Sequence, residues 1–325
     1  MTNLPIKMVT NRWDFLMPLA LGEVRPKGID LTLDTSTGMA ALQSDSSFQA
    51  GEASIGHYLL RASRGAREWV GLPAFPMRAF RHRCFLVRRD SPLRGLTDLK
   101  QLEGKRVGID GWPNSGNTWT RVVMRQDGVD IWKVNWVVAP VQFGGLLPVH
   151  ATPPDLPRGV VPGATGKSLV DLTLEGEIDV MVAAFMPSGF FQPDSPLVHL
   201  IPDFPAAEAA HYRRFGYIPA HHLLTIRREV AEEHPWALQS LTDAFQASKE
   251  AWQIQRRHLA DIGPWGLAEL ERTAATFGDD WNPVGLEPNM KMLRDLCQDQ
   301  AAQGLVRAAV DPAEAFADYA RLTSA

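Results

Sequence analysis

Arginine and histidine side chains are crowded among aromatic residues in one short segment. Arg78, Arg81 and His82 alternate there with Phe75 and Phe80. Burying a cation costs free energy unless an anion neutralises it, and a guanidinium can bind a planar carboxylate through two parallel hydrogen bonds. We therefore predict that Arg78 and Arg81 bind a carboxylate. The alternatives are a solvated basic strand and, for His82, a core histidine bonded to a backbone carbonyl.

A second polar segment follows a short apolar strand at residues 106–109. Trp112, Asn114 and Ser115 lie in this loop, and a helix opens near Asn117. The first turn of a helix presents unpaired N–H groups and the positive end of the helix dipole, which suit an anion. We predict that the loop takes part in substrate binding. Capping by Ser115 or Asn117 explains the same residues, and Trp112 either stacks on a ligand ring or packs in the core.

The turn after the first strand contains Arg12 and Asp14. Open α/β sheets bind ligands at the carboxyl ends of their strands, so Arg12 is a further candidate for substrate binding. Asp14 precedes the apolar residues of a short helix, and N-capping explains it.

Several side chains could transfer protons. Glu52 and His57 lie at a strand-to-helix turn, where a carboxylate and an imidazole could share acid–base work. His221 and His222 are neighbours in a later strand and must point to opposite faces, so at most one faces a ligand. His82 is an alternative acid or base.

A metal site is the other interpretation of Glu52, His57, His82 and His222. Their spacing matches no compact ligand motif such as H-E-x-x-H. We therefore predict neither a metal nor a cofactor. In the plainest interpretation, Glu52 is a helix-start charge and His57 faces solvent.

Composition excludes several classes of protein. The 325 residues are 45% hydrophobic and 22% charged with a net charge of −4, which favours neither a nucleic acid nor a membrane as partner. Two distant cysteines give no disulfide framework. The N-terminus lacks the pattern of a signal peptide, and no apolar run could span a bilayer. We expect a cytoplasmic protein and allow for a homo-oligomer.

The segment GATGKS at residues 163–168 invites comparison with a phosphate-binding loop. Val161 stands where that loop needs its first glycine. Ser168 followed by Asp171 predicts a capping box instead.

The elements that position these residues alternate between strands and helices. Apolar runs predict strands at 6–9, 29–33, 69–74, 84–87, 107–109, 135–138, 180–184, 198–201 and 218–228. Helical spacing recurs near 58–62, 119–126, 169–174, 236–252, 267–276, 290–296 and 312–322. Residues 140–166 are rich in proline and glycine and predict a long loop. This alternation indicates an α/β protein with largely parallel sheets.

Two strands, near 85–89 and 217–224, are expected to cross between two lobes and act as a hinge. Lobe 1 would then comprise 1–89 and 217–325, and lobe 2 would comprise 90–216. Such a clamshell binds its ligand in the cleft between the lobes.

The order of motifs resembles the type II periplasmic binding protein-like fold and, within it, the 4,5-dihydroxyphthalate decarboxylase family. The matching segments are N-x-x-D at 11–14, the turn at 52–58, RASRG at 61–65, GLPAFPxRxFRH at 71–82, LEGKRVGI at 102–109, EHPW at 233–236 and WNPVGLEPN at 281–289. The resemblance implies a cytosolic enzyme that removes a carboxylate from an aromatic acid, a phthalate derivative. It also favours His222 over His221 as the residue facing the cleft.

The resulting hypothesis is a cofactor-independent decarboxylase, a lyase of aromatic compound catabolism, that acts on a hydroxylated aromatic acid. Its site needs a cationic clamp, a base for the phenol and an acid aimed at the ring carbon. Two alternatives stay open. One is a binding protein that captures a small aromatic acid without chemistry, and the other is a hydrolase or another lyase acting on a related ring.

Overall fold

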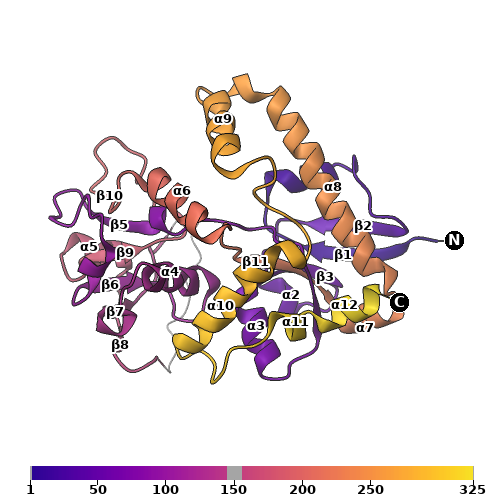
Figure 1. The fold of residues 1–325 in the computed structure, drawn as a ribbon, viewed down its shortest axis with the longest axis horizontal. Helices are drawn as coiled ribbons and strands as arrows, with labels where there is room; N and C mark the ends of the chain where they lie inside the picture. Colours follow the sequence, from indigo (N-terminus) through magenta and orange to yellow (C-terminus); the bar gives the residue numbers. More distant parts are fainter. Residues whose placement is uncertain (1, 145–155, 325) are drawn as a thin grey trace. The chain divides into compact units, whose positions relative to one another are not determined.

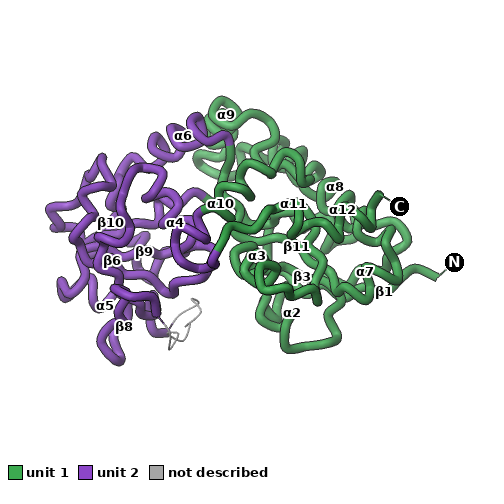
Figure 2. Tube along the Cα trace, turned by 60° about the horizontal axis from the view of Figure 1, so that its bottom comes forward, with its two compact units in different colours: residues 1–79, 217–298, 308–325 green, residues 80–216, 299–307 purple. Residues whose placement is uncertain are grey.

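The computed structural model describes residues 2–144 and 156–324. The chain forms two compact units, coloured separately in Figure 2. Unit 1 comprises Met1–Ala79, Tyr217–Gln298 and Ala308–Ala325, and unit 2 comprises Phe80–Gly216 and Asp299–Arg307. Each unit is built around one mixed sheet, so the predicted α/β class is confirmed.

Unit 1 contains a five-stranded sheet in the order β2-β1-β3-β11-β4. Strands β1, β2, β3 and β11 are labelled in Figure 1. Its strands are β1 (Leu4–Val9), β2 (Ile29–Asp34), β3 (Ala50–Ser54), β4 (Trp69–Leu72) and β11 (His222–Arg227). The apolar run of β11 is buried throughout, as expected for a strand covered on both faces.

The helices of unit 1 are α1 (Met17–Ala20), α2 (Ala41–Ser44), α3 (Ile55–Ser63), α7 (Arg228–Glu233), α8 (Trp236–His258), α9 (Gly266–Phe277), α11 (Pro312–Ala315) and α12 (Ala317–Thr323). Helix α10 (Met290–Ala302) begins in unit 1, and its residues from Asp299 onward belong to unit 2. Helix α8 directs Leu238, Leu241 and Phe245 into the core with Ile6 and Ile226. The spacing of these three residues is that of one helix face.

Unit 2 contains a six-stranded sheet in the order β10-β5-β9-β6-β7-β8. Its strands are β5 (Phe85–Arg88), β6 (Arg106–Ile109), β7 (Asn135–Val138), β8 (Val160–Pro162), β9 (Val180–Val182) and β10 (Leu197–His199), and its helices are α4 (Ser115–Gln126), α5 (Leu169–Leu174) and α6 (Phe204–Phe215). Strands β6 to β9 are mutually parallel, whereas β5 runs antiparallel to β9 and β10.

The observed boundary between the units differs from the expected one at residue 89. It falls between Ala79 and Phe80, because β5 pairs with β9 and β10 in unit 2. Residues 299–307 also belong to unit 2 rather than to the lobe expected for them.

Ser168 caps α5 in the predicted capping box with Asp171. The N-cap interpretation of Asp14 is wrong, because Asp14 lies inside the short helix Asp14–Leu16 and Trp13 precedes it. The predicted loop at 140–166 contains the short strand β8, and its residues 145–155 lie outside the described part of the chain. Among the described residues, no helix is long and apolar enough to cross a bilayer.

Candidate active site

Several of the predicted site residues lie at one end of the strands of the unit 1 sheet. Strands β1, β2 and β3 run parallel, and β11 runs antiparallel to β3 and β4. The carboxyl ends of β1 to β4 therefore lie at the same end of the sheet as the amino end of β11. Asn11 follows β1, Ser54 ends β3 and His222 begins β11 at this end.

Glu52 and His222 are in direct contact. Glu52 stands opposite Leu224 in the register of β3 and β11, so His222 lies diagonally from Glu52 on the same face. Oε1 of Glu52 is hydrogen-bonded to Nδ1 of His222. The Glu52 side chain has no exposed surface, whereas 15% of the His222 side chain remains exposed.

Three further donors converge on the Glu52 carboxylate. The backbone N–H of Asn11 donates to Oε2 at 2.8 Å, and the indole N–H of Trp13 donates to the same oxygen at 2.9 Å. The side-chain amide of Asn11 donates to Oε1 at 3.1 Å. An ionised carboxylate accepts at both oxygens, so this set of donors offsets the cost of burying it.

The contact with Glu52 orients the imidazole. Because Nδ1 donates to Glu52, a neutral His222 ring carries its free lone pair at Nε2. A carboxylate that holds one ring nitrogen leaves the other to exchange a proton with a ligand. The neighbouring His221 is buried, and its Nε2 donates to the Ala79 carbonyl at 2.9 Å.

Arg12 and His57 lie at the same end of the sheet. Arg12 is exposed in the turn after β1, and its Nε donates to the Thr35 carbonyl at 3.3 Å. His57 is exposed in the first turn of α3, where its backbone N–H donates to the Ser54 cap at 3.4 Å.

Arg78 is bound within unit 1 by acceptors from the C-terminal third of the chain. Its Nε donates to Asn282 Oδ1 at 2.5 Å, and its Nη1 donates to the Ile218 carbonyl at 3.0 Å. Its Nη2 donates to Asn289 Oδ1 and, at 3.2 Å, to the Pro283 carbonyl. These contacts give Arg78 a role in holding the segment after β4 against residues 282–289.

Arg81 lies in unit 2, apart from these contacts. Only 1% of its surface is exposed, and its Nε donates to Thr120 Oγ1 of α4 at 3.1 Å. The structure therefore brings Arg81 together with the helix whose first turn was predicted to bind an anion. It does not bring Arg78 and Arg81 into one described unit.

The polar loop before α4 is held by its own side chains. Asn114 caps the helix by accepting from the Asn117 N–H at 2.8 Å, and Asp110 accepts from the Asn117 amide at 2.6 Å. Trp112 is 2% exposed and packs edge-to-face on Trp136. The core-packing alternative for Trp112 is thus observed, whereas the cap of α4 is Asn114 and not Ser115 or Asn117.

His82 is buried in unit 2, with its ring 5.3 Å from that of His211. Burial, reinforced by the charge of Arg83, lowers the pKa of His82 to about 4. A neutral His82 cannot donate a proton near neutral pH, so His222 is the stronger candidate for the acid.

Metal-binding groups do not cluster in the part of the chain that the structure describes, where no three or more His, Cys, Asp or Glu side chains could share an ion. His82 lies in unit 2, whereas Glu52, His57 and His222 lie in unit 1.

Asn11, Trp13 and Thr120 contact candidate site residues and were not predicted from the sequence. Asn11 and Trp13 flank Arg12 in the N-x-x-D motif, which drew attention to the charged residue rather than to its neighbours. Thr120 is four residues after Gly116 on α4, a spacing that places both on one helix face.

Comparisons with known proteins agree with the predicted resemblance. No protein-family model matches the chain. The chain is 27% identical over 328 residues to the 4,5-dihydroxyphthalate decarboxylase of Comamonas testosteroni, with 97% of each protein covered. It is 26% identical over 223 residues to the 4,5-dihydroxyphthalate decarboxylase of Pseudomonas putida, covering 67% of this chain and 84% of that protein.

Solved structures show the same fold at lower identity. The alkanesulfonate-binding protein SsuA from Xanthomonas axonopodis pv. citri, bound to MOPS, has a TM-score of 0.53 at 14% identity, covering 96% of this chain and 98% of that one. The periplasmic aliphatic sulphonate binding protein SsuA from Escherichia coli has a TM-score of 0.51 at 14% identity, covering 95% and 91%. The predicted fold and resemblance are thus confirmed: over nearly its whole length this chain is similar to a 4,5-dihydroxyphthalate decarboxylase, and it has the fold of the periplasmic binding proteins.

Proposed function

We propose that this protein is a cofactor-independent carboxy-lyase that removes a carboxylate, as CO2, from a hydroxylated aromatic acid. The contact between buried Glu52 and partly exposed His222 is the observation that carries the proposal. It supplies an oriented proton-transfer group in a chain whose relatives are named decarboxylases. The expectation that the substrate lies between the two lobes is part of the proposal and comes from the fold class alone. A cytoplasmic location likewise stays an expectation from sequence.

The chemistry explains why a proton donor is needed. Direct loss of CO2 from an aryl carboxylate would leave an unstable aryl anion. Protonation of the ring carbon that bears the carboxylate avoids this anion, because an ionised ring hydroxyl donates electrons and forms a dienone. The C–C bond to the carboxylate then breaks, its electron pair restores the aromatic ring and CO2 departs. We assign both proton transfers to Nε2 of His222, which accepts the proton of the ring hydroxyl and then delivers a proton to the ring carbon, and we assign orientation of the imidazole to Glu52.

Release of CO2 from a panel of hydroxylated aromatic acids, including 4,5-dihydroxyphthalate, tests the proposal. The His222→Asn variant should lower turnover by roughly 100-fold or more, which is the scale of lost general acid–base catalysis. His258→Asn, an exposed change on α8, is the matched control and should keep wild-type turnover. Full turnover in His222→Asn would show that another residue donates the proton.

A binding protein without chemistry is the second candidate function. It is favoured by the solved structures of sulfonate-binding proteins that share this fold, since a fold alone does not fix an activity. Saturable binding of an aromatic acid with no CO2 release across the panel would support it.

A further inference from the structure

Trp13 donates a hydrogen bond to the oxygen of Glu52 that is not bonded to His222. Its indole N–H donates to Oε2 at 2.9 Å, and the backbone N–H of Asn11 donates to the same oxygen at 2.8 Å. His222 is bonded to the other oxygen, Oε1. A carboxylate is planar, so the two donors that hold Oε2 also determine the direction in which Oε1 faces the imidazole.

The indole of Trp13 is held in place by the core of unit 1. Its ring stacks on that of Phe15, with centroids 6.2 Å apart and an angle of 3° between the planes. Phe15 in turn packs edge-to-face against Phe245 and Trp252 of α8. The N–H that reaches Glu52 therefore belongs to a packed aromatic cluster, and its direction is fixed by this packing.

The charge of Glu52 is stabilised by neutral donors whenever His222 is neutral. Among the described residues, His222 is the only basic side chain within ion-pair distance of Glu52. The other charged or titratable groups at this end of the sheet, Arg12, Asp14 and His57, are exposed. In the proposed reaction the imidazole alternates between a charged and a neutral form, so for part of the cycle no cation lies beside the buried carboxylate. Hydrogen bonds to the charged oxygens must then keep it ionised.

Loss of one donor changes where the protons reside. The ionised form of Glu52 becomes less favourable relative to the protonated form when a hydrogen bond to it is removed. A protonated Glu52 donates its O–H to Nδ1 of His222, and a neutral ring that accepts at Nδ1 carries its N–H at Nε2. This ring has no lone pair at Nε2, so it cannot accept the proton of the substrate hydroxyl. The imidazole is then present at the site but protonated on the wrong nitrogen.

We propose that Trp13 is a positioning residue: its indole N–H keeps Glu52 ionised and thereby keeps the proton of the neutral His222 ring on Nδ1. The part of this inference that concerns turnover rests on the proposed function, whereas the state of the imidazole is a property of the folded protein alone. Trp13 acts through Glu52, and Nε2 of His222 remains the atom that exchanges protons with the substrate.

NMR spectra of the ring nitrogens of His222, recorded on the full-length protein without substrate, test the proposal. The His222→Asn variant identifies the His222 signals. Trp13→Phe keeps an aromatic ring beside Phe15 but has no N–H. In this variant the ratio of rings protonated only at Nε2 to rings protonated at Nδ1 should rise roughly tenfold or more, the effect of losing a hydrogen bond to a charged acceptor. An unchanged ratio would overturn the proposal.

Trp136→Phe is the matched control. Trp136 is buried in unit 2, and its indole N–H donates to the Ile131 carbonyl at 2.7 Å, so this variant also loses a buried hydrogen bond. Its melting temperature should fall by an amount similar to that of Trp13→Phe, while the His222 signals should stay as in the wild type. Equal changes of the His222 signals in both variants would indicate a general loss of packing and would contradict a positioning role.

Asn11→Leu provides a second variant of the donor set. It removes the side-chain donor to Oε1 of Glu52 at 3.1 Å and leaves the backbone N–H of residue 11 in place. The His222 signals should change in the same direction as in Trp13→Phe. Wild-type signals in both variants would show that Glu52 stays ionised without these donors.

Kinetics separate a failure of this proposal from a failure of the proposed function. On an acid that the wild type decarboxylates, Trp13→Phe should lower kcat roughly tenfold or more and leave KM unchanged, because Trp13 acts through Glu52. A raised KM at unchanged kcat would overturn the positioning role. Altered His222 signals in Trp13→Phe, with no CO2 release by the wild type from any acid of the panel, would retain the positioning role and refute the decarboxylase. CO2 release by the wild type with unchanged His222 signals in Trp13→Phe would do the reverse.

Discussion

Glu52 shows how a single buried carboxylate can organise a site. Its two oxygens face four donors from Asn11, Trp13 and His222, which lie far apart in the sequence. Each oxygen accepts hydrogen bonds from two donors. The side chain therefore joins the turn after β1 to the amino end of β11, and it sets the direction of the imidazole.

Replacing Glu52 with glutamine should lower both the free energy of unfolding and the rate of CO2 release. One oxygen becomes an NH2 group that must face two donors, and a buried polar group left unsatisfied costs about 1–3 kcal/mol. The free energy of unfolding should fall by that amount in a denaturant titration, and CO2 release should fall by roughly 100-fold.

The exposed Glu23 of the same unit provides the matched control, since Glu23→Gln changes the same charge without burial. A Glu52→Gln variant as stable as Glu23→Gln would mean that the four donors do not depend on the carboxylate.

The sequence predicted which types of residue belong to the candidate site, but it did not predict their hydrogen-bond partners. It singled out Glu52 as a carboxylate at a strand-to-helix turn. Strand alternation allowed only one of His221 and His222 to face a ligand, and the family resemblance favoured His222. It could not separate Arg78 from Arg81, which share their charge and surroundings in the sequence. The acceptors that occupy Arg78 are Asn282 and Asn289, about 200 residues away.

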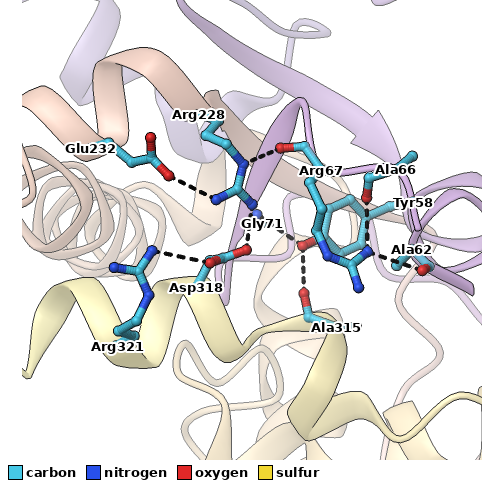
Figure 3. A network of polar contacts seen from close by, with 10 residues as sticks. All are labelled: Tyr58, Ala62, Ala66, Arg67, Gly71, Arg228, Glu232, Ala315, Asp318 and Arg321. Carbon is cyan, nitrogen blue, oxygen red and sulfur yellow. Dashed lines mark hydrogen bonds and ion pairs between the residues drawn. The ribbon is translucent and has the colours of Figure 1, made fainter.

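At the scale of elements, a polar network binds the C-terminal helices to the sheet of unit 1 (Figure 3). The Tyr58 hydroxyl on α3 donates to the Ala315 carbonyl at 2.7 Å and accepts from the Gly71 N–H of β4 at 3.1 Å. Burial raises the pKa of Tyr58 to about 12. Arg228 of α7 is paired with Asp318 of α12, which also accepts from Arg321 at 3.2 Å.

Removing the Tyr58 hydroxyl should loosen this junction. The Tyr58→Phe variant leaves a strand N–H and a helix carbonyl without their partner, so the free energy of unfolding should fall by about 1–3 kcal/mol. Tyr319→Phe is the control, because the Tyr319 hydroxyl makes longer hydrogen bonds, at 3.3 and 3.5 Å. Equal stability of the two variants in thermal melts would show that the network contributes little.

The positions of the strands in the sequence were predicted better than their pairing in the sheets. The strand at β5 was recognised, yet it was assigned to the first lobe and is found in the sheet of unit 2. A short apolar run indicates a strand but does not say which neighbour it will pair with. Strand β8 was missed because three residues in a proline- and glycine-rich stretch carry almost no periodicity.

For the molecule as a whole, the burial of His82 predicts a loss of stability in acid. Its pKa of about 4 in the folded protein lies below the ordinary value of 6.5. Between these two pH values the unfolded chain binds more protons than the folded protein does. The contribution of His82 to the free energy of unfolding is therefore complete above pH 6.5 and is lost as the pH falls to 4. The difference corresponds to about 3 kcal/mol.

Denaturant titrations at pH 7 and pH 4 test this expectation. Wild type should lose about 3 kcal/mol more than His82→Phe, which keeps a ring beside His211 but cannot take up a proton. An identical loss in both proteins would mean that His82 titrates normally.

The position of β11 in the sheet has a consequence for synthesis on the ribosome. Among the described strands, β4 pairs only with β11, and about 150 residues separate the two in the sequence. At typical rates of translation, β4 and the open edge of β3 must wait roughly 10–30 s for their partner. The nascent chain thus carries two unpaired strand edges while unit 2 emerges, which is a period of exposure to misassembly. The same late strand brings His222 to Glu52, so the contact between these two side chains can form only when this sheet closes.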